Sequence, residues 1–277
     1  MLILRWALSM IEWQVQLEIF VSLLRELNGN RQEQSGKLRF DRSAVLVSDV
    51  AGQYYCEKKV ELQYLHGKIE TEEKNIGTEA HERLTEDAVK VKREELWQKI
   101  YGSEPVFALE MFLLAKYGDV FLVGKPDSVL FTRGFPLVVF EYKFSRSCVA
   151  YPSYHVQAQT YGVLLGNMGF DTSRLFYAIV VADPKTRGSQ ELRQNVVRTV
   201  MANGLKEAVH SVNDAKIYFS KFNRLEAEKD LAWALEFWNK IREAQPTSNQ
   251  SKCAKCEYQA QCRGPMFQIS SSIDKSS

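Results

Sequence analysis

Apolar residues recur at two different spacings along the chain, and the change of spacing divides it into segments. From Val45 to about Gln98 the spacing is helical, with many charged residues and few breakers. From Pro105 onward, runs rich in Val, Phe, Leu and Tyr are punctuated by Gly and Pro. This pattern predicts three strands of a meander over residues 105–131 and 135–145.

The second half of the chain returns to helical spacing and then alternates between the two patterns. We predict a helix over residues 153–169 and strands over 174–183 and 215–222. A long amphipathic helix follows over 224–245, and Pro246 is predicted to end it. The layout predicts one α/β domain, in which a mixed and mostly contiguous sheet is flanked by helices.

The two ends of the chain differ from this central part. The apolar opening is interrupted by Arg5, Glu12 and Glu18, so we expect an N-terminal helix lying on the domain or on a partner, without stable membrane association. Residues 25–44 are polar and turn-rich, which predicts a linker. The predicted organisation is an N-terminal extension, a folded domain and a disordered tail: residues 1–44, 45–265 and 266–277.

Composition and charge restrict the function only weakly. The formal net charge is +2, so the chain as a whole does not resemble a nucleic-acid binder, although a local basic patch is compatible with this value. Five cysteines, an odd number in a chain of 277 residues, do not fit a secreted disulfide framework. Thiols at metal-binding spacing in a reducing cytoplasm are the better interpretation.

Two carboxylates and a lysine are the strongest chemical signal in the chain. Asp127 ends one predicted strand, and Glu141 and Lys143 lie two residues apart on the next. Because a strand has a period of two, Glu141 and Lys143 project from the same face, opposite Tyr142. Carboxylates that converge suit Mg²⁺ or Mn²⁺, and a nearby lysine can hold a water molecule for phosphodiester hydrolysis. The structural alternative is a cross-strand salt bridge between Glu141 and Lys143 at a sheet edge, with Asp127 as a turn residue.

Three further residues surround this signal. His81 lies in a predicted helix, where its imidazole could add a nitrogen ligand that favours Mn²⁺, although a lone helical histidine is commonly a surface or packing residue. Gln157 and Tyr161 lie four residues apart on one helical face and could both point towards the carboxylates. The alternative interpretation of Gln157 and Tyr161 is that they belong to a half-buried helix face without a functional role.

Three cysteines crowd the segment SKCAKCEYQAQCRG near the C-terminus. Cys253, Cys256 and Cys262 are one thiolate short of a closed four-coordinate site. Thiolate-only sets suit either zinc or an iron–sulfur cluster. Cys148 lies apart from this segment, and a small buried hydrophobic residue is its expected role.

Taken together, these motifs resemble the RecB-like iron–sulfur branch of the PD-(D/E)XK nuclease superfamily. The order that carries the resemblance is His81, Asp127 in GKPD, Glu141-Tyr142-Lys143, and Gln157 with Tyr161. Within this branch, the short layout is most similar to the CRISPR-associated exonuclease family Cas four. Related helicase–nucleases carry a motor as well, and the chain has no G-x4-G-K-[ST] phosphate loop.

The resemblance implies a role for each of these residues. His81, Asp127, Glu141 and the Tyr142 carbonyl would bind Mn²⁺ or Mg²⁺. Lys143 would orient the attacking water, and Gln157 and Tyr161 would help to hold the strand. Cys56 would be the fourth ligand of a [4Fe–4S] cluster, favoured over [2Fe–2S] or zinc, with the set completed by Cys253, Cys256 and Cys262. This cluster would close a helical annex onto the PD-(D/E)XK fold.

The resemblance also implies a function and partners. It implies a metal-dependent DNA exonuclease that cleaves single-stranded DNA ends and trims fragments for CRISPR spacer acquisition with the integrase complex. Such an enzyme would be cytoplasmic, and an oligomer is compatible with it. The alternative is a non-catalytic iron–sulfur or zinc DNA-binding subunit of a DNA-processing complex. One departure from the branch is Glu57-Lys58, where Pro-Arg usually follows the first cysteine.

Overall fold

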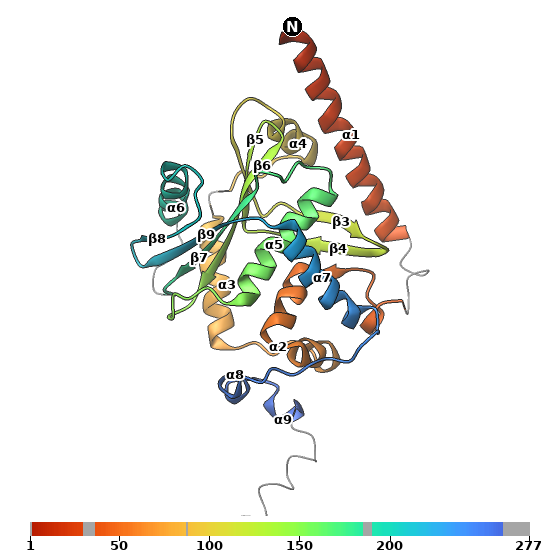
Figure 1. Cartoon of the computed structure of the whole chain (residues 1–277), viewed down its shortest axis with the longest axis vertical. Coiled ribbons are helices and arrows are strands. Elements are labelled where there is room, and N and C mark those ends of the chain that lie inside the picture. Colours follow the sequence, from red (N-terminus) through yellow and green to blue (C-terminus); the bar gives the residue numbers. More distant parts are fainter. Residues whose placement is uncertain (1, 30–36, 87, 185–189, 263–277) are drawn as a thin grey trace, which may run out of the picture.

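The computed structural model describes residues 2–29, 37–86, 88–184 and 190–262, and within them the strands form two sheets. A three-stranded sheet has the order β1-β4-β3, and a six-stranded sheet has the order β2-β5-β6-β7-β9-β8 (Figure 1). The strands are β1 (Val45–Leu46), β2 (Val106–Leu109), β3 (Leu113–Tyr117), β4 (Val120–Gly124), β5 (Ser128–Thr132), β6 (Phe135–Phe144), β7 (Phe176–Ala182), β8 (Ala208–Val212) and β9 (Ala215–Lys221).

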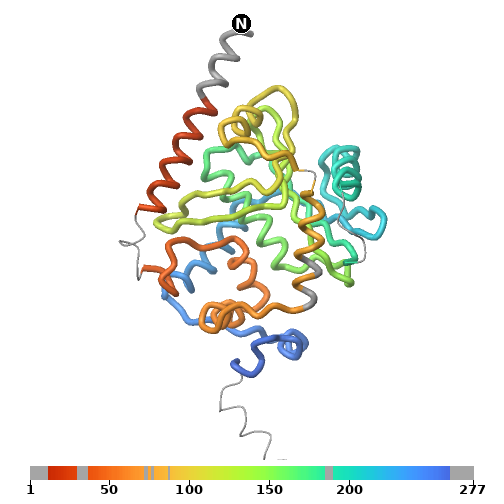
Figure 2. The backbone as a smooth tube through the Cα atoms, turned by 180° about the vertical axis from the view of Figure 1, so that it is seen from behind, coloured from red at the N-terminus to blue at the C-terminus, as the bar shows by residue number. Residues whose placement is uncertain are grey.

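Helices cover both faces of the larger sheet, and one of them connects the two sheets (Figures 1 and 2). The helices are α1 (Leu2–Gly29), the short 3-10 turn η1 (Arg39–Asp41), α2 (Val47–His66), α3 (Glu72–Leu84), α4 (Arg93–Ile100), α5 (Pro152–Asn167), α6 (Gln190–Ala202), α7 (Arg224–Trp238), α8 (Gln250–Ala254) and α9 (Gln259–Cys262). Helix α5 contacts β3 and β4 of one sheet and β6 and β7 of the other. It also packs against α2 and α7, so it is the central helix of the molecule.

The six-stranded sheet has an apolar core on each face because its central strands are buried on both sides. Val139 on β6 packs towards α5, and Phe140 packs towards α3 and α6. Strands β6 and β7 are parallel and α5 is the connection between them, which is the usual way to join parallel neighbours. Mixed α/β sheets flanked by helices are therefore confirmed as the fold class.

The predicted meander was too simple. The region consists of five strands, β2 to β6, which are divided between the two sheets. A two-residue turn at Gly118, with φ of 57°, folds β3 back onto β4 within the smaller sheet. Helix α6 and strand β8 were not predicted. Helix α7 ends at Trp238, well before Pro246, and the chain beyond it is extended across α2.

The N-terminal helix α1 lies on the domain along its second half. Leu17 and Phe20 are buried in the main core, and the Gln16 side chain donates to the carbonyl of Gly169 at 2.8 Å. Helix α1 runs to Gly29, so it enters the segment predicted to be a linker. Among the described residues, no helix combines the length and the apolar character needed to cross a membrane. The predicted tail, residues 266–277, lies outside the described residues.

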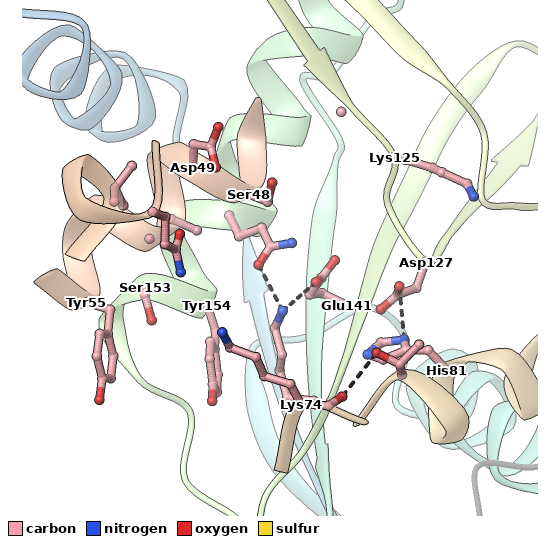
Figure 3. Close-up of a pocket in the computed structure, with 18 of the residues that line it drawn as sticks. Ser48, Asp49, Tyr55, Lys74, His81, Lys125, Asp127, Glu141, Ser153 and Tyr154 are labelled. Atoms are coloured by element: carbon pink, nitrogen blue, oxygen red, sulfur yellow. Dashed lines mark hydrogen bonds and ion pairs between the residues drawn. The ribbon is translucent and has the colours of Figure 1, made fainter. Parts of the chain in front are cut away.

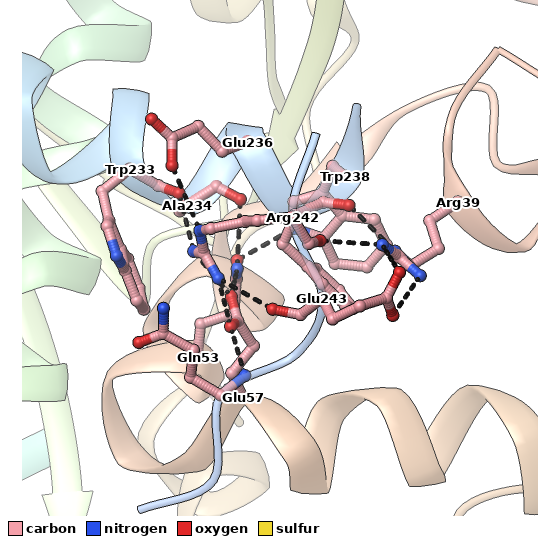
Figure 4. Close-up of polar contacts among 11 residues, drawn as sticks. Arg39, Gln53, Glu57, Trp233, Ala234, Glu236, Trp238, Arg242 and Glu243 are labelled. Atoms are coloured by element: carbon pink, nitrogen blue, oxygen red, sulfur yellow. Dashed lines mark hydrogen bonds and ion pairs between the residues drawn. The ribbon is translucent and has the colours of Figure 1, made fainter. Parts of the chain in front are cut away.

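A buried carboxylate ties the kinked helix α2 to the segment after α7 (Figure 4). Cys56 has φ −169° and ψ 110°, which are not helical, so the N–H of Lys58 leaves the helix ladder and donates to the carbonyl of Gln245 at 3.2 Å. The next side chain, Glu57, is 1% exposed and accepts from both terminal nitrogens of Arg242 and from the Gln245 N–H at 2.8 Å. Glu57, which stands where the RecB-like branch usually has proline, therefore has a structural role in this chain.

This pairing makes a prediction about stability. Replacing Glu57 by Gln removes the buried, bidentate counter-charge of Arg242 and leaves it only the half-exposed Glu236 at 3.2 Å, so we expect the free energy of unfolding to fall by about 3 kcal/mol. Urea denaturation followed by circular dichroism measures the change. Glu243→Gln is the matched control, because Glu243 pairs with Arg39 while its side chain is 83% exposed, and we expect less than about 1 kcal/mol there. Equal losses in both variants would contradict the assigned role of Glu57.

Candidate active site

Asp127 is held at the edge of the larger sheet by the pairing of two strands. It directly precedes β5, which runs antiparallel to β6 with Ser128 opposite Phe140, so Asp127 reaches the level of Glu141. Its Oδ2 accepts the backbone N–H of Tyr142 at 2.6 Å. The sequence predicted Asp127 at the end of a strand; it lies instead one residue before β5, in a position that brings it close to Glu141 and Tyr142.

Glu141 and Lys143 project from one face of β6 towards α5, as the strand period predicts. The Lys143 ammonium donates to Glu141 Oε1 at 2.8 Å and to Gln157 Oε1 at 2.9 Å. Gln157 in turn donates to the Tyr161 hydroxyl at 3.2 Å, and Tyr161 donates to the carbonyl of Lys125 at 3.1 Å. A continuous chain of hydrogen bonds therefore runs from the strand charges along one side of α5.

His81 approaches the same place from α3. Its Nδ1 lies 3.3 Å from Asp127 Oδ1, and its ring meets the ring of Phe144 edge to face at 5.4 Å. Burial alone would lower the pKa of His81, but the hydrogen bond to Asp127 and that carboxylate's charge raise it above its usual value. The contact with Asp127 therefore favours the protonated form of His81 while no metal ion is bound.

These residues line one cavity of about 810 Å³ between α2, α3, β6 and α5 (Figure 3). Glu141 is 3% exposed, and its second oxygen, Oε2, is buried without a hydrogen-bond partner among the described residues. Burial, and then the negative charge of Asp127, raise the pKa of Glu141 to about 7. Burial would lower the pKa of Lys143, but Glu141 and Asp127 raise it. The cavity therefore holds a buried acid and a charged amine side by side.

The side chains are paired with one another and do not form a closed metal cage. Within the described ranges, no three His, Cys, Asp or Glu side chains lie close enough together to hold one metal ion. Asp127 bonds to His81 and to the Tyr142 N–H, and one oxygen of Glu141 bonds to Lys143. The unpaired Glu141 Oε2 is the oxygen left available in this arrangement.

The four predicted cluster cysteines line a second cavity, of about 790 Å³. Cys56 lies at the kink of α2. Cys253 lies on α8, Cys256 in the turn after it, and Cys262 at the end of α9. None of the five cysteines forms a disulfide. Burial, and then the other three thiols of the set, raise the pKa of Cys262. The fold therefore gathers these cysteines around one space, although their ligand role stays a prediction.

A tyrosine and a glutamate fix the cysteine segment to the domain. Tyr258 is fully buried, and its hydroxyl donates to the Gly67 carbonyl at 2.5 Å and accepts the Ile69 N–H at 3.0 Å. Glu257 pairs with Lys59 at 3.0 Å and with Lys74 at 2.8 Å. Neither residue was singled out in the sequence, because both lie among cysteines that dominate the segment.

Comparison with known proteins identifies the domain. The sequence model of the PD-(D/E)XK nuclease superfamily matches residues 46–263. The chain belongs to this superfamily. Its members are generally metal-dependent nucleases, and they typically use Mg²⁺ or Mn²⁺.

Other comparisons add little. The crystal structure of SSO0001 is similar with a TM-score of 0.40 and 11% identity, covering 89% of this chain and 96% of that one. A similarity at this level supports no argument about function. No curated protein matches the sequence.

Two further residues of this nuclease-superfamily site lie outside the set predicted from the sequence. Tyr154 lines the cavity from the first turn of α5, and its spacing of three residues before Gln157 is the signal that could have found it. Glu110 has a positive φ of 48° and pairs with Lys125 at 2.8 Å on the cavity wall. The local sequence does not predict this position of Glu110, because the bend in which its N–H donates to the Asp127 carbonyl is a tertiary feature.

The environment of Glu141 predicts a pH dependence. In EDTA-treated protein, we expect the Glu141 carboxyl to titrate near pH 7, against an ordinary 4.5, because it is buried next to Asp127. NMR of glutamate labelled with ¹³C at the carboxyl group measures this value, and Glu141→Gln assigns the signal. Asp127→Asn should lower the pKa of Glu141, because the negative charge of Asp127 is removed while burial remains.

The sign of the linked stability follows from the same shift. The folded state holds this proton more tightly than the unfolded chain does. The contribution of Glu141 to stability is therefore fully present below about pH 4.5 and is lost as the pH rises to about 7. Glu141→Gln should show a flatter stability profile over this window. A wild-type carboxyl that titrates near 4.5 would contradict the environment described for Glu141.

Proposed function

We propose that this chain is a metal-dependent deoxyribonuclease that cleaves single-stranded DNA ends. The observation that carries the proposal is the buried Glu141–Lys143 pair at the base of the cavity, completed by Asp127 and His81. Burying these two charges costs free energy, whereas a salt bridge on the surface avoids that cost. The burial therefore supports a functional role for the pair. Membership of the superfamily supports nuclease chemistry, and the resemblance to Cas four supports single strands as the substrate.

The donor set fits Mg²⁺ or Mn²⁺. Asp127 and Glu141 offer carboxylate oxygens, the Tyr142 carbonyl offers another oxygen, and His81 offers a nitrogen that favours Mn²⁺. The partnerless Oε2 of Glu141 supports this fit, because a buried carboxylate oxygen normally has a partner. When bound, the ion would supply Lewis-acid stabilisation of the phosphate and a water of lowered pKa.

The protein groups would orient the reactants. Lys143, held between Glu141 and Gln157, would hold the attacking water by a hydrogen bond from its amine. Gln157 fixes the amine and would contact the strand, and Tyr161 supports Gln157 from the next turn of α5. Preorganised donors of this kind lower the barrier because they need no rearrangement during the reaction.

We further propose that Cys56, Cys253, Cys256 and Cys262 bind a [4Fe–4S] cluster with a structural role. The shared cavity and the spacing of the three C-terminal cysteines support this proposal. By resemblance, the pathway would be the trimming of DNA fragments for CRISPR spacer acquisition, with the integrase complex as partner. The competing possibility is a non-catalytic DNA-binding subunit with the same fold.

Catalysis is tested by replacing the lysine. We expect Lys143→Ala to lower kcat on end-labelled single-stranded DNA at least about 100-fold, because the water loses its positioning group. Cleavage should need Mn²⁺ or Mg²⁺ and stop with EDTA. Lys125→Ala is the matched control, because Lys125 lines the same cavity but pairs with Glu110. Intact DNA with wild-type protein in both metals would favour the binding-subunit alternative.

The cluster is tested separately from catalysis. Protein purified without oxygen should contain iron and sulfide and show the broad visible absorption of an iron–sulfur cluster. Cys256→Ala should lose both, because one of four thiolates is removed. Cys148→Ala should keep both, because Cys148 does not line the cysteine cavity. A colourless wild-type protein that contains zinc would contradict the iron–sulfur assignment and leave the nuclease test unaffected.

A further inference from the structure

The cavity side of α5 carries an aromatic residue in addition to Gln157 and Tyr161. Tyr154 lies three residues before Gln157 and seven before Tyr161, so the three side chains follow one stripe of the helix. All three line the cavity that contains Glu141 and Lys143. This stripe therefore faces the charged residues of β6 over two turns of helix.

The ring of Tyr154 contacts the Lys143 amine. The Nζ atom lies 5.2 Å from the ring centroid, within the range at which a ring face attracts a cation. The same nitrogen bonds to Glu141 Oε1 at 2.8 Å and Gln157 Oε1 at 2.9 Å. An ammonium group on a flexible four-carbon chain is thus contacted by a carboxylate, an amide and an aromatic ring.

The ring is itself held in place. Tyr154 packs against the main apolar core and meets the ring of Tyr151 edge to face at 5.5 Å. Its backbone N–H donates to the Tyr151 carbonyl at 2.9 Å, at the start of α5. The Tyr154 hydroxyl makes no hydrogen bond to any described residue, so its contact with Lys143 uses the ring face alone.

We propose that Tyr154 is a positioning residue that holds the Lys143 amine beside Glu141 through the face of its ring. This inference rests on the proposed function, in which Lys143 orients the attacking water. Without the ring, the lysine stem gains rotamers in which the amine leaves Glu141 and Gln157. The water would then be oriented in only a fraction of the bound complexes, which lowers the turnover rate.

A different role for the ring makes a different prediction. Aromatic residues in nuclease clefts can stack on DNA bases, and that contribution belongs to substrate binding. A stacking residue would change KM for single-stranded DNA, whereas a residue that positions Lys143 changes kcat. The contact already made between the Tyr154 ring and Lys143 favours positioning.

The test compares three variants with the wild type. Tyr154→Phe keeps the ring and removes the unbonded hydroxyl, so we expect nearly unchanged kcat and KM. Tyr154→Leu keeps apolar bulk and removes the ring, so kcat should fall about tenfold with KM within about twofold, a loss between those expected for an exposed and for a desolvated cation–π contact. Tyr151→Phe is the control, because it removes a neighbouring hydroxyl and keeps the ring that contacts Tyr154, and its kcat should change less than about twofold.

A second measurement does not depend on activity. In EDTA-treated protein with ¹³Cε-labelled lysine, the Lys143 methylene signal should be shifted upfield by the aromatic ring. Lys143→Met assigns the signal. The upfield shift should persist in Tyr154→Phe and disappear in Tyr154→Leu, and thermal unfolding confirms that each variant is folded.

The outcomes separate this inference from the proposed function. If Tyr154→Leu raises KM and leaves kcat unchanged, the ring stacks on substrate and the positioning role is overturned. An unchanged Lys143 signal in folded Tyr154→Leu would overturn it as well. If Lys143→Ala cleaves DNA as fast as the wild type, the proposed function fails, and the NMR signal alone then decides whether Tyr154 holds the amine.

Discussion

The need to satisfy two opposite charges on a buried strand governs the centre of this molecule. Glu141 and Lys143 lie on β6, and the residues around them on this strand, 137–140, 142 and 144, belong to the two apolar cores. Moving a carboxylate and an ammonium out of water costs several kcal/mol each, as an order of magnitude, unless each finds partners. Helix α5 supplies the Gln157 amide and an aromatic ring, so its position between the two sheets is required by the charges as well as by packing.

The sequence predicted those features that depend on local periodicity. The period of two on β6 placed Glu141 and Lys143 together, and the helical period of α5 placed Gln157 beside Tyr161. The turn at Gly118 was visible in the sequence, yet periodicity could not show that the chain changes sheet between β2 and β3 and again between β4 and β5. The end of α7 was misplaced because its C-terminal neighbour Arg242 is held by Glu57, a partner 185 residues away.

The two cavities share a wall, which links the predicted metal chemistry to the predicted cluster. Tyr55 and Lys59 on α2 line both cavities, and Lys252 near the cysteines donates to the Tyr55 carbonyl at 3.1 Å. Glu57 and Tyr258 hold the same region through protein contacts alone. The cysteine segment is therefore anchored to α2 by hydrogen bonds and ion pairs, and a bound cluster would add to this anchoring.

The contact between Glu57 and Arg242 also constrains how the protein is made. The carboxylate and its arginine are 185 residues apart, and translation proceeds at about 5–20 residues per second, so about 10–40 s separate their synthesis. During that interval the ribosome-bound chain displays Glu57 without Arg242, although α5, which packs against α2, is already synthesised part-way through. The contact between Glu57 and Arg242 therefore forms only after the strands of the larger sheet, which end at Lys221, have been synthesised.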